Sequence, residues 1–156
     1  KGLKNFKGVQ RRFNKIFTFN KVDFFDDYAH HPTEIKVVLD GVNSVYKGYE
    51  KICIFQPHRI SRLKDLKKEF TYAFKHADQV ILFPIYTAGE KIKLGFSYFN
   101  FAKELIKNSK VKLFLIENKF QLAKYVKNNI YGKKIVIGMG AGTISAWIRE
   151  LPKLLR

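Results

Sequence analysis

The clearest chemical signal in this sequence is a pair of arginines, Arg59 and Arg62, three residues apart and preceded by Pro57 and His58. A guanidinium group is a planar fork that can bind a carboxylate or phosphate through two parallel hydrogen bonds. At the start of a helix, a spacing of three allows both side chains to point to one side, and the helix amino terminus adds partial positive charge. We therefore predict an anion clamp here, with His58 as a contributor. Two solvated arginines are the alternative.

A second candidate cluster places two acids, a tyrosine and two histidines in one short turn: Asp26, Asp27, Tyr28, His30 and His31. Strand termination and helix capping are a simpler explanation for the acids. The number of unusual side chains exceeds what capping requires, so we favour a binding role. Adjacent histidines are poor co-ligands within one element, and the chain has no HxxxH motif, so we expect no metal site.

Two further segments complete the set of candidates. Tyr86–Glu90 supplies Glu90, and the glycine-rich Gly138–Thr143 supplies Gly140 and Gly142. A glycine turn lets main-chain amides approach a ligand, although such turns also serve simply to pack a strand against a helix. No GxxxxGK[ST] motif occurs in the chain, so a triphosphate cradle is not predicted within it.

These segments must be positioned by strands and helices that alternate along the chain. Helical spacing and capping predict helices over Pro32–Tyr46, Ser61–Phe74, Tyr98–Lys107 and Lys119–Lys127, and a last one capped by Thr143. Short apolar runs predict strands over Val22–Phe25, Lys51–Phe55, Gln79–Phe83, Val111–Ile116 and Lys134–Ile137. The alternation predicts an α/β three-layer sandwich: a mostly parallel sheet with helices on both faces. The candidate segments follow strands, so we expect them at the carboxyl edge of the sheet, where ligands bind.

The beginning of the chain is predicted to form a lead-in and a hairpin, in contrast to the alternating strands and helices that follow. Ile16–Phe19 is predicted to pair with Val22–Phe25 across the Asn20-Lys21 turn. We expect residues 1–14 to be a lead-in and residues 15–156 to be the domain. The sequence starts at Lys1 instead of methionine, so we expect it to be part of a longer polypeptide.

Size and composition fit one folded domain. The 156 residues are 46% hydrophobic, enough for a core, and no apolar run approaches the roughly 18–20 residues of a membrane helix. The one cysteine, Cys53, lies in an apolar run and is predicted to be a buried structural thiol. Because an internal disulfide is impossible, we expect a cytoplasmic protein and no membrane partner.

The charge is strongly positive, with 30 Lys and Arg against 13 Asp and Glu, or +17. Such a balance suggests an anionic partner, which can be a nucleic acid or a phosphorylated substrate. The lysines are scattered over several predicted helices, so a solvated lysine-rich surface is the simpler explanation. A basic α/β domain that binds nucleic acid remains an alternative, but the aromatic residues fall inside predicted strands and helices. We therefore expect no nucleic-acid partner.

Together, the four segments resemble the Mur ligases of peptidoglycan synthesis. The resemblance rests on Asp26–Glu34, Gln56–Arg62, Tyr86–Glu90 and Gly140–Ile144, with Phe6–Phe13 resembling the join to the family's central domain. It spans the chain in order. It implies the Rossmann-like C-terminal domain of a three-domain, ATP-dependent ligase that forms amide bonds through an acyl phosphate.

The resemblance also implies residue roles around ATP. Arg12 would reach its phosphates, Asp27 its ribose and Tyr28 the adenine region. ATP and Mg²⁺ would both be held mainly by the central domain, which this chain lacks. No catalytic residue is expected in this chain, and the chain alone is expected to be inactive.

The resemblance further implies that His30, Arg59 and Arg62 hold the carboxylate of an incoming amino acid, in agreement with the anion clamp. The motifs are most similar to the branch of the family that joins L-alanine to UDP-N-acetylmuramic acid. The branch that attaches a recycled peptide is the alternative, and it usually lacks the Gln56–Arg62 motif.

Overall fold

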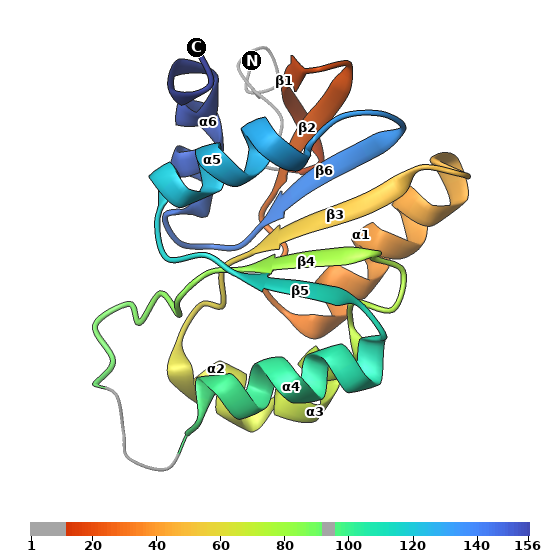
Figure 1. Cartoon of the computed structure of the whole chain (residues 1–156). Helices are drawn as coiled ribbons and strands as arrows, with labels where there is room; N and C mark the ends of the chain where they lie inside the picture. The colour runs from red at the N-terminus through yellow and green to blue at the C-terminus, as the bar shows by residue number, and fades with distance from the viewer. Residues whose placement is uncertain (1–11, 92–95) are drawn as a thin grey trace, which may run out of the picture.

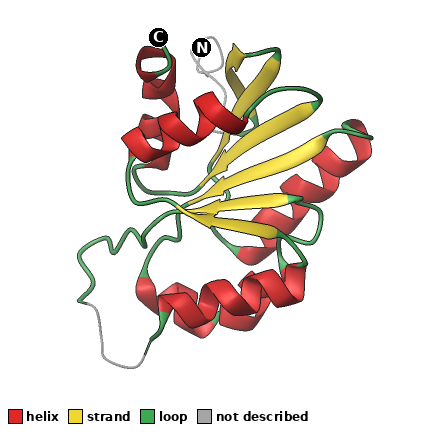
Figure 2. Ribbon diagram, viewed as in Figure 1, coloured by secondary structure: helices red, strands yellow, loops and turns green. Residues whose placement is uncertain are grey.

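The structure is a computed structural model that describes residues 12–91 and 96–156. Within these residues one sheet has the strand order β1-β2-β6-β3-β4-β5 (Figures 1 and 2). Its strands are β1 (Asn14–Phe19), β2 (Val22–Asp27), β3 (Glu50–Phe55), β4 (Gln79–Leu82), β5 (Lys112–Leu115) and β6 (Lys134–Met139). The pairs β2·β6, β6·β3, β3·β4 and β4·β5 are all parallel.

β1 is the antiparallel exception, and it confirms the predicted hairpin. It pairs with β2 across Asn20 and Lys21, whose φ angles are 48° and 64°. Positive φ at both central residues gives the turn the twist that matches two right-twisted strands. Phe13, just before β1, stacks on Phe25 with 4.4 Å between ring centroids, so packing against the core begins before the strand. Residues 1–11 of the predicted lead-in lie outside the described residues.

The helices divide between the two faces of the sheet (Figure 2). They are α1 (Pro32–Val45), α2 (Ile60–Asp65), α3 (Lys67–Tyr72), α4 (Tyr98–Ser109), α5 (Lys119–Asn129) and α6 (Ile144–Leu154). The buried residues of α1 to α4 join one core cluster and those of α5 and α6 join the other. The expected Rossmann-like α/β sandwich, with helices on both faces of a mostly parallel sheet, is confirmed.

β3 shows how one strand serves both layers. Cys53 and Phe55 belong to the core under α1 to α4, and Ile52 and Ile54 belong to the core under α5 and α6. All four are fully buried, so the strand is an uninterrupted apolar run, as expected for a central parallel strand. Cys53 is fully buried, as predicted, and this burial raises the pKa of its thiol. None of the described helices is long and apolar enough to cross a membrane.

The predicted single helix over Ser61–Phe74 is wrong, because the structure breaks it into α2 and α3 at Leu66. Leu66 has φ −110° and ψ 24°, outside the helical range, and it ends one helix and begins the next. The change of direction allows Leu63 of α2 and Phe70 of α3 both to be buried. No glycine or proline marks the break in the sequence.

Candidate functional site

The loops that follow β2, β3 and β4 meet at the carboxyl edge of the sheet, as predicted. A row of four rings crosses this edge. Tyr28 and His30 have centroids 4.9 Å apart, His30 and His58 are 5.9 Å apart, and His58 and Tyr86 are stacked at 5.5 Å. His58 and Tyr86 also form an isolated parallel bridge between their loops. Residues from three separate loops therefore form one continuous surface.

Arg62 is fixed by His58. Its Nη1 donates to His58 Nδ1 at 3.1 Å and to the His58 carbonyl oxygen at 3.4 Å. Since a guanidinium only donates, Nδ1 must be the acceptor and any ring proton of neutral His58 sits on Nε2. Partial burial lowers the pKa of His58, and the nearby charges of Arg62, His30 and Arg59 lower it further. The neutral imidazole that Arg62 needs is therefore the favoured form.

Arg59 occupies a strained position immediately before α2. Its φ is 69° and its ψ is 131°, a region that residues with a Cβ rarely adopt. Such a backbone costs on the order of 1–3 kcal/mol and is stable only when its surroundings enforce it. Here the Arg59 N–H donates to the Tyr86 carbonyl at 2.8 Å, and the Tyr86 N–H donates to the Pro57 carbonyl at 2.8 Å. These bonds hold an exposed guanidinium beside the Arg62–His58 pair.

His30 is oriented by its own loop. Its Nδ1 lies 2.8 Å from the Tyr28 carbonyl oxygen, which can only accept, so Nδ1 carries a proton. Nε2 is then the ring nitrogen that remains for a ligand. The geometry places His30 beside His58 and the two arginines, the residues predicted to form the carboxylate clamp.

His31 has a different and structural position. It is the N-cap of α1: its Nδ1 accepts from the Thr33 N–H at 3.2 Å. Glu34 Oε2 accepts from the N–H groups of His30 and His31 at 3.0 and 3.1 Å and completes a capping box. The cap fixes where α1 begins and so holds the His30 loop against the sheet.

The two acids of this loop are also tied into the fold. Asp26 is fully buried, and its Oδ2 accepts from Ser145 Oγ at 2.5 Å and from Arg149 Nη2 at 3.3 Å, both on α6. Asp27 accepts from the Ala29 N–H at 2.7 Å and, through its other oxygen, from the Phe13 N–H at 2.8 Å. Both carboxylates therefore stabilise the loop that carries Tyr28 and His30.

The glycine-rich turn after β6 is filled by protein. A Cβ at Gly142 would lie 2.7 Å from both Gln56 Oε1 and Tyr86 Cγ. At Gly140, where φ is 151°, a Cβ would lie 3.0 Å from the Gln56 carbonyl oxygen. Close packing, the alternative explanation for this turn, is therefore supported on the side where a Cβ would lie.

Thr143 is the N-cap residue of α6, as predicted, but its side chain makes no cap bond. The first N–H of α6, from Ile144, instead donates to Gln56 Oε1 at 3.0 Å. The Gln56 amide also donates to Thr143 Oγ1 at 3.0 Å. Gln56 therefore joins the loop after β3 to the loop after β6, a role that the sequence did not reveal. Its position directly after a strand was the available signal.

Glu90 joins the loop after β4 to the start of α2. It accepts from the Ser61 hydroxyl at 2.5 Å and from the Ser61 N–H at 3.0 Å, and these bonds keep the pKa of the Glu90 carboxyl below its usual value. A hollow of about 340 Å³ lies beside this contact, with Ile60 and Phe96 in its wall. Glu90 therefore stabilises the segment that carries Arg59 and Arg62 indirectly, by holding the start of α2.

Two of the three residues that the resemblance assigns to ATP are exposed at the surface of the domain. Tyr28 and Arg12 are exposed, whereas Asp27 is only 7% exposed. Their contact with a nucleotide stays a prediction. The described residues contain no cluster of three His, Cys, Asp or Glu side chains that would fit a metal ion.

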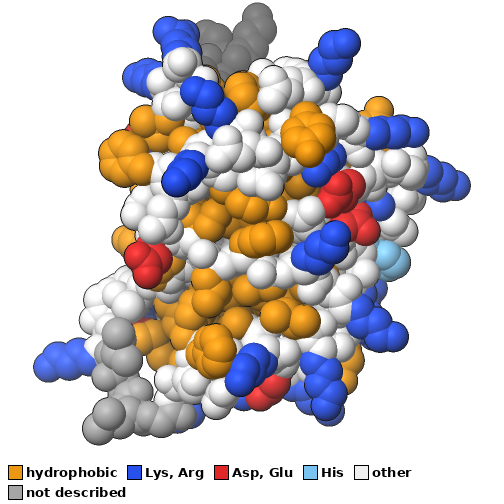
Figure 3. All heavy atoms as spheres, in the orientation of Figure 1, with side chains coloured by type: hydrophobic (Ala, Val, Ile, Leu, Met, Phe, Trp, Pro, Cys, Tyr) orange, Lys and Arg blue, Asp and Glu red, His pale blue; other side chains and the backbone are white. Residues whose placement is uncertain are grey.

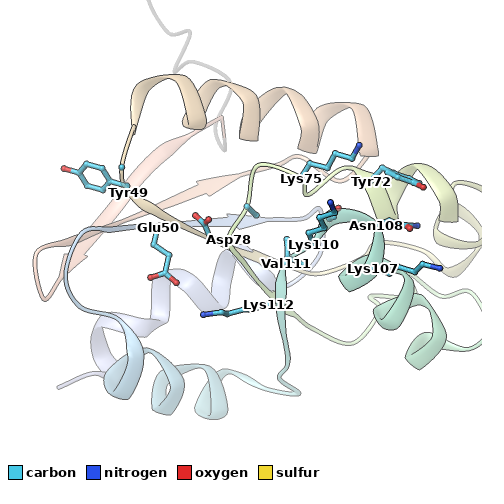
Figure 4. Close-up of a pocket in the computed structure, with 13 residues that line it drawn as sticks. Tyr49, Glu50, Tyr72, Lys75, Asp78, Lys107, Asn108, Lys110, Val111 and Lys112 are labelled. Atoms are coloured by element: carbon cyan, nitrogen blue, oxygen red, sulfur yellow. The ribbon is translucent and has the colours of Figure 1, made fainter.

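A larger hollow, about 1200 Å³, lies at the opposite, amino edge of the sheet (Figure 4). Lys107 and Lys110 come from the end of α4, and Lys112 from the start of β5. Glu50 and Asp78 lie between them and Tyr49 (Figure 4). No prediction from the sequence falls in this hollow.

A mostly parallel α/β sandwich with its polar loops gathered at the carboxyl edge is a Rossmann-like ligand-binding domain. The family is shown by comparison: a family model described as "Mur ligase, glutamate ligase domain" matches residues 11–142. The chain belongs to the Mur ligase family.

Individual relatives agree with this assignment. The UDP-N-acetylmuramate–L-alanine ligase of Pelagibacter ubique is 73% identical over 155 residues, which are 99% of this chain and 33% of that protein. The chain thus spans about a third of the length of this curated relative. The solved structure of the UDP-N-acetylmuramate–alanine ligase of Thermotoga maritima has a TM-score of 0.72 and 27% identity, over 97% of this chain and 31% of that one.

A third comparison concerns an isolated domain. The solved structure of a domain from a putative UDP-N-acetylmuramate:L-alanyl-γ-D-glutamyl-meso-diaminopimelate ligase of Haemophilus ducreyi has a TM-score of 0.67 and 16% identity. It covers 93% of this chain and 100% of that one. At this identity the likeness shows the fold alone, and it shows that a domain of this fold has been crystallised separately.

Proposed function

We propose that this chain is the amino-acid-holding domain of an ATP-dependent ligase that joins L-alanine to UDP-N-acetylmuramic acid in peptidoglycan synthesis. The observation that carries the proposal is the arrangement of Arg59, Arg62 and His30 around neutral His58. Two guanidinium groups and a histidine at one open edge match the single carboxylate of a free amino acid. The 73% identity to a ligase named for L-alanine supports the choice of amino acid.

The proposed role of these side chains is to bind and orient. Arg59 and Arg62 hold the carboxylate of L-alanine, and His30 lies beside His58 at the same edge and completes the clamp. The amine is thereby directed at the acyl phosphate of the muramyl group. Its nitrogen forms the amide bond, phosphate leaves, and the amine loses a proton. Orientation of this kind contributes up to several orders of magnitude in rate.

The proposed contacts to ATP are peripheral. Tyr28 would lie against the adenine and Arg12 near the phosphates, in keeping with their exposure. Asp27 would reach the ribose only while it also binds the two main-chain N–H groups. ATP and Mg²⁺ would be held mainly outside this chain, because it contains no GxxxxGK[ST] motif to cradle a triphosphate.

We further propose that the isolated chain has no ligase activity and that the complete enzyme is cytoplasmic. The first rests on the same missing triphosphate-binding motif. The second is supported by a buried, reduced Cys53 and by a reaction that uses ATP. Turnover by the 156 residues alone would refute the first, and export of the complete protein would refute the second.

The test of the substrate uses a complete ligase that contains this chain. ADP release is measured with UDP-N-acetylmuramic acid and either L-alanine or L-Ala-γ-D-Glu-diaminopimelate. We expect turnover with L-alanine and none with the tripeptide. Turnover only with the tripeptide would keep the family and move the assignment to the peptide-recycling ligase. No turnover with either would overturn the proposal.

A further inference from the structure

Positive charge alone does not distinguish the carboxyl edge of the sheet. Figure 3 shows Lys and Arg side chains spread over much of one face of the molecule. Arg62 is set apart by its partner, a histidine ring, because its Nη1 donates to His58 Nδ1 at 3.1 Å. The direction of the guanidinium therefore depends on what holds the imidazole of His58 in its plane.

The ring of Tyr86 lies against this imidazole. The two rings are stacked, with 5.5 Å between their centroids and 19° between their planes. His30 contacts the imidazole edge-on, with centroids 5.9 Å apart and planes at 67°. The last side-chain torsion of a histidine is intrinsically soft, so its neighbours decide the orientation of the ring. The stack on Tyr86 opposes a rotation that would carry Nδ1 away from Arg62.

The ring of Tyr86 is itself seated in the glycine-rich turn after β6. A Cβ at Gly142 would lie 2.7 Å from Tyr86 Cγ and 2.8 Å from Tyr86 Cβ. A larger residue at position 142 must therefore push the ring away or move the turn. Gly142 thus leaves the space that Tyr86 needs in order to lie against His58.

The main chain of Tyr86 is fixed independently of its ring. Its N–H donates to the Pro57 carbonyl at 2.8 Å, and its carbonyl accepts from the Arg59 N–H at 2.8 Å. Neither bond uses a side-chain atom, so both can persist when the ring is replaced. The effect of the ring can therefore be separated from the effect of the loop.

We propose that Tyr86 is a positioning residue for the carboxylate clamp. Its ring fixes the imidazole of His58, and the imidazole holds Arg62 in the direction that binds the carboxylate of the amino acid. The inference rests on the proposed function of Arg62 in binding that carboxylate. The ring of Tyr86 is needed for this role and its hydroxyl is not, because the stack on His58 is made by the ring.

Steady-state kinetics of a complete ligase separate the ring from the hydroxyl. Tyr86→Leu keeps an apolar side chain without the planar ring, and it should raise the apparent KM for L-alanine about ten-fold, because the clamp is no longer aligned. The kcat and the KM for ATP should change little. Tyr86→Phe keeps the ring and should retain the KM of the unmodified enzyme.

Thr87→Ala is the matched control in the same loop, since Thr87 accepts from the Glu90 N–H through its main-chain carbonyl, and it should change none of these values. Circular dichroism confirms that each variant is folded. An unchanged KM for L-alanine in Tyr86→Leu would refute the inference. So would a Tyr86→Phe variant that behaves like Tyr86→Leu, because the hydroxyl would then be responsible.

Nuclear magnetic resonance of the histidine side-chain nitrogens observes His58 without any substrate. The His58 signals are identified by their loss in His58→Asn. In the unmodified ligase we expect the tautomer with its proton on Nε2 and a pKa below the ordinary 6.5. In Tyr86→Leu we expect a mixture of tautomers and a pKa closer to 6.5, because water then reaches the imidazole. Tyr86→Phe should match the unmodified enzyme.

The other groups around His58 are the same in all these variants. Arg62, His30 and Arg59 lower the pKa of His58, and Glu90 raises it. A change of the pKa in Tyr86→Leu therefore reports the loss of the ring that covers the imidazole.

The two measurements can fail separately. An unmodified ligase that does not use L-alanine would refute the proposed function, and the clamp with it. An enzyme that uses L-alanine but whose His58 keeps one tautomer and one pKa in Tyr86→Leu would refute the role of Tyr86 alone.

Discussion

The two edges of the sheet carry similar charges in different ways. At the carboxyl edge, Arg62 is bonded to His58, and Arg59 is fixed through the main chain of Tyr86. At the amino edge, Lys107 and Lys112 have no carboxylate within 4.0 Å among the described residues. Lys134 at the same edge pairs with Glu50 at 3.0 Å, so what distinguishes the candidate site is an arginine bonded to a histidine instead of a lysine paired with an acid. Helix carboxyl termini at the amino edge are sufficient reason for lysines there.

The largest expected effect is on the use of L-alanine, when an arginine at the carboxyl edge is replaced and compared with a replaced lysine at the amino edge. In a complete ligase, Arg62→Ala should raise the apparent KM for L-alanine about 100-fold, equivalent to about 2.8 kcal/mol, because a charge-assisted pair of bonds is lost. The KM for ATP should change little. Lys107→Ala, at the amino edge, should change neither value by more than about two-fold. Steady-state kinetics on both variants decide the matter, and equal effects on L-alanine and ATP would contradict the carboxylate role.

The packing of the glycine turn gives the next largest effect. Gly142→Ala should lower the free energy of unfolding by about 1–3 kcal/mol, since the added methyl meets Gln56 and Tyr86 at 2.7 Å. Gly41→Ala is the matched control within α1, where the added methyl meets no atom within 4 Å. It should raise stability by about 0.5–1 kcal/mol. Urea denaturation measures both, and a stable Gly142→Ala variant would mean that the turn has free space.

Backbone strain offers another test of the difference between the two edges, because each edge has a cationic residue at positive φ. Arg59 has φ 69° and Lys110, which ends α4, has φ 57°. Glycine at either position should raise the free energy of unfolding by up to about 1 kcal/mol. Only Arg59→Gly should impair the use of L-alanine. If Lys110→Gly impaired it equally, the two edges would not differ in function.

The smallest expected effect is a pH dependence. The pKa of His58 lies below its ordinary value of 6.5, so the neutral ring, which accepts from Arg62, is favoured at pH 7. Its contribution to stability is present above pH 6.5 and is lost as pH falls through the lowered pKa. The apparent KM for L-alanine should therefore rise a few-fold below pH 6.5. His58→Asn should flatten this profile and His76→Gln should leave it unchanged, as pH-dependent kinetics can show.

Much of the fold follows from local sequence, and the exceptions have physical causes. The β-hairpin at Asn20-Lys21 and the central strand around Cys53 were predictable from turn and apolar patterns. The break at Leu66 was not, because it depends on how Leu63 and Phe70 reach the core. The apolar run of β5 predicts a strand but cannot distinguish a central strand from an edge strand.

The positions of the candidate residues were more predictable than their contacts, and their functional roles stay predictions. Arg59, Arg62 and His30 come together as the strand-end rule requires. The functions of Gln56 and His31 as helix caps were not evident, because Gln56 acts on Ile144, 88 positions along the chain. Local capping rules assign that task to Thr143. The spacing of residues along the sequence does not reveal partners that are so far apart in the chain.

One carboxylate has a mechanical consequence. Asp27 binds the N–H of Phe13, just before β1, and the N–H of Ala29, beside His30. Phe13 also stacks on Phe25. Displacing Phe13 from the sheet must therefore break both contacts or move the loop that carries His30. The position of the chain before β1 and the setting of the His30 loop are thus mechanically coupled.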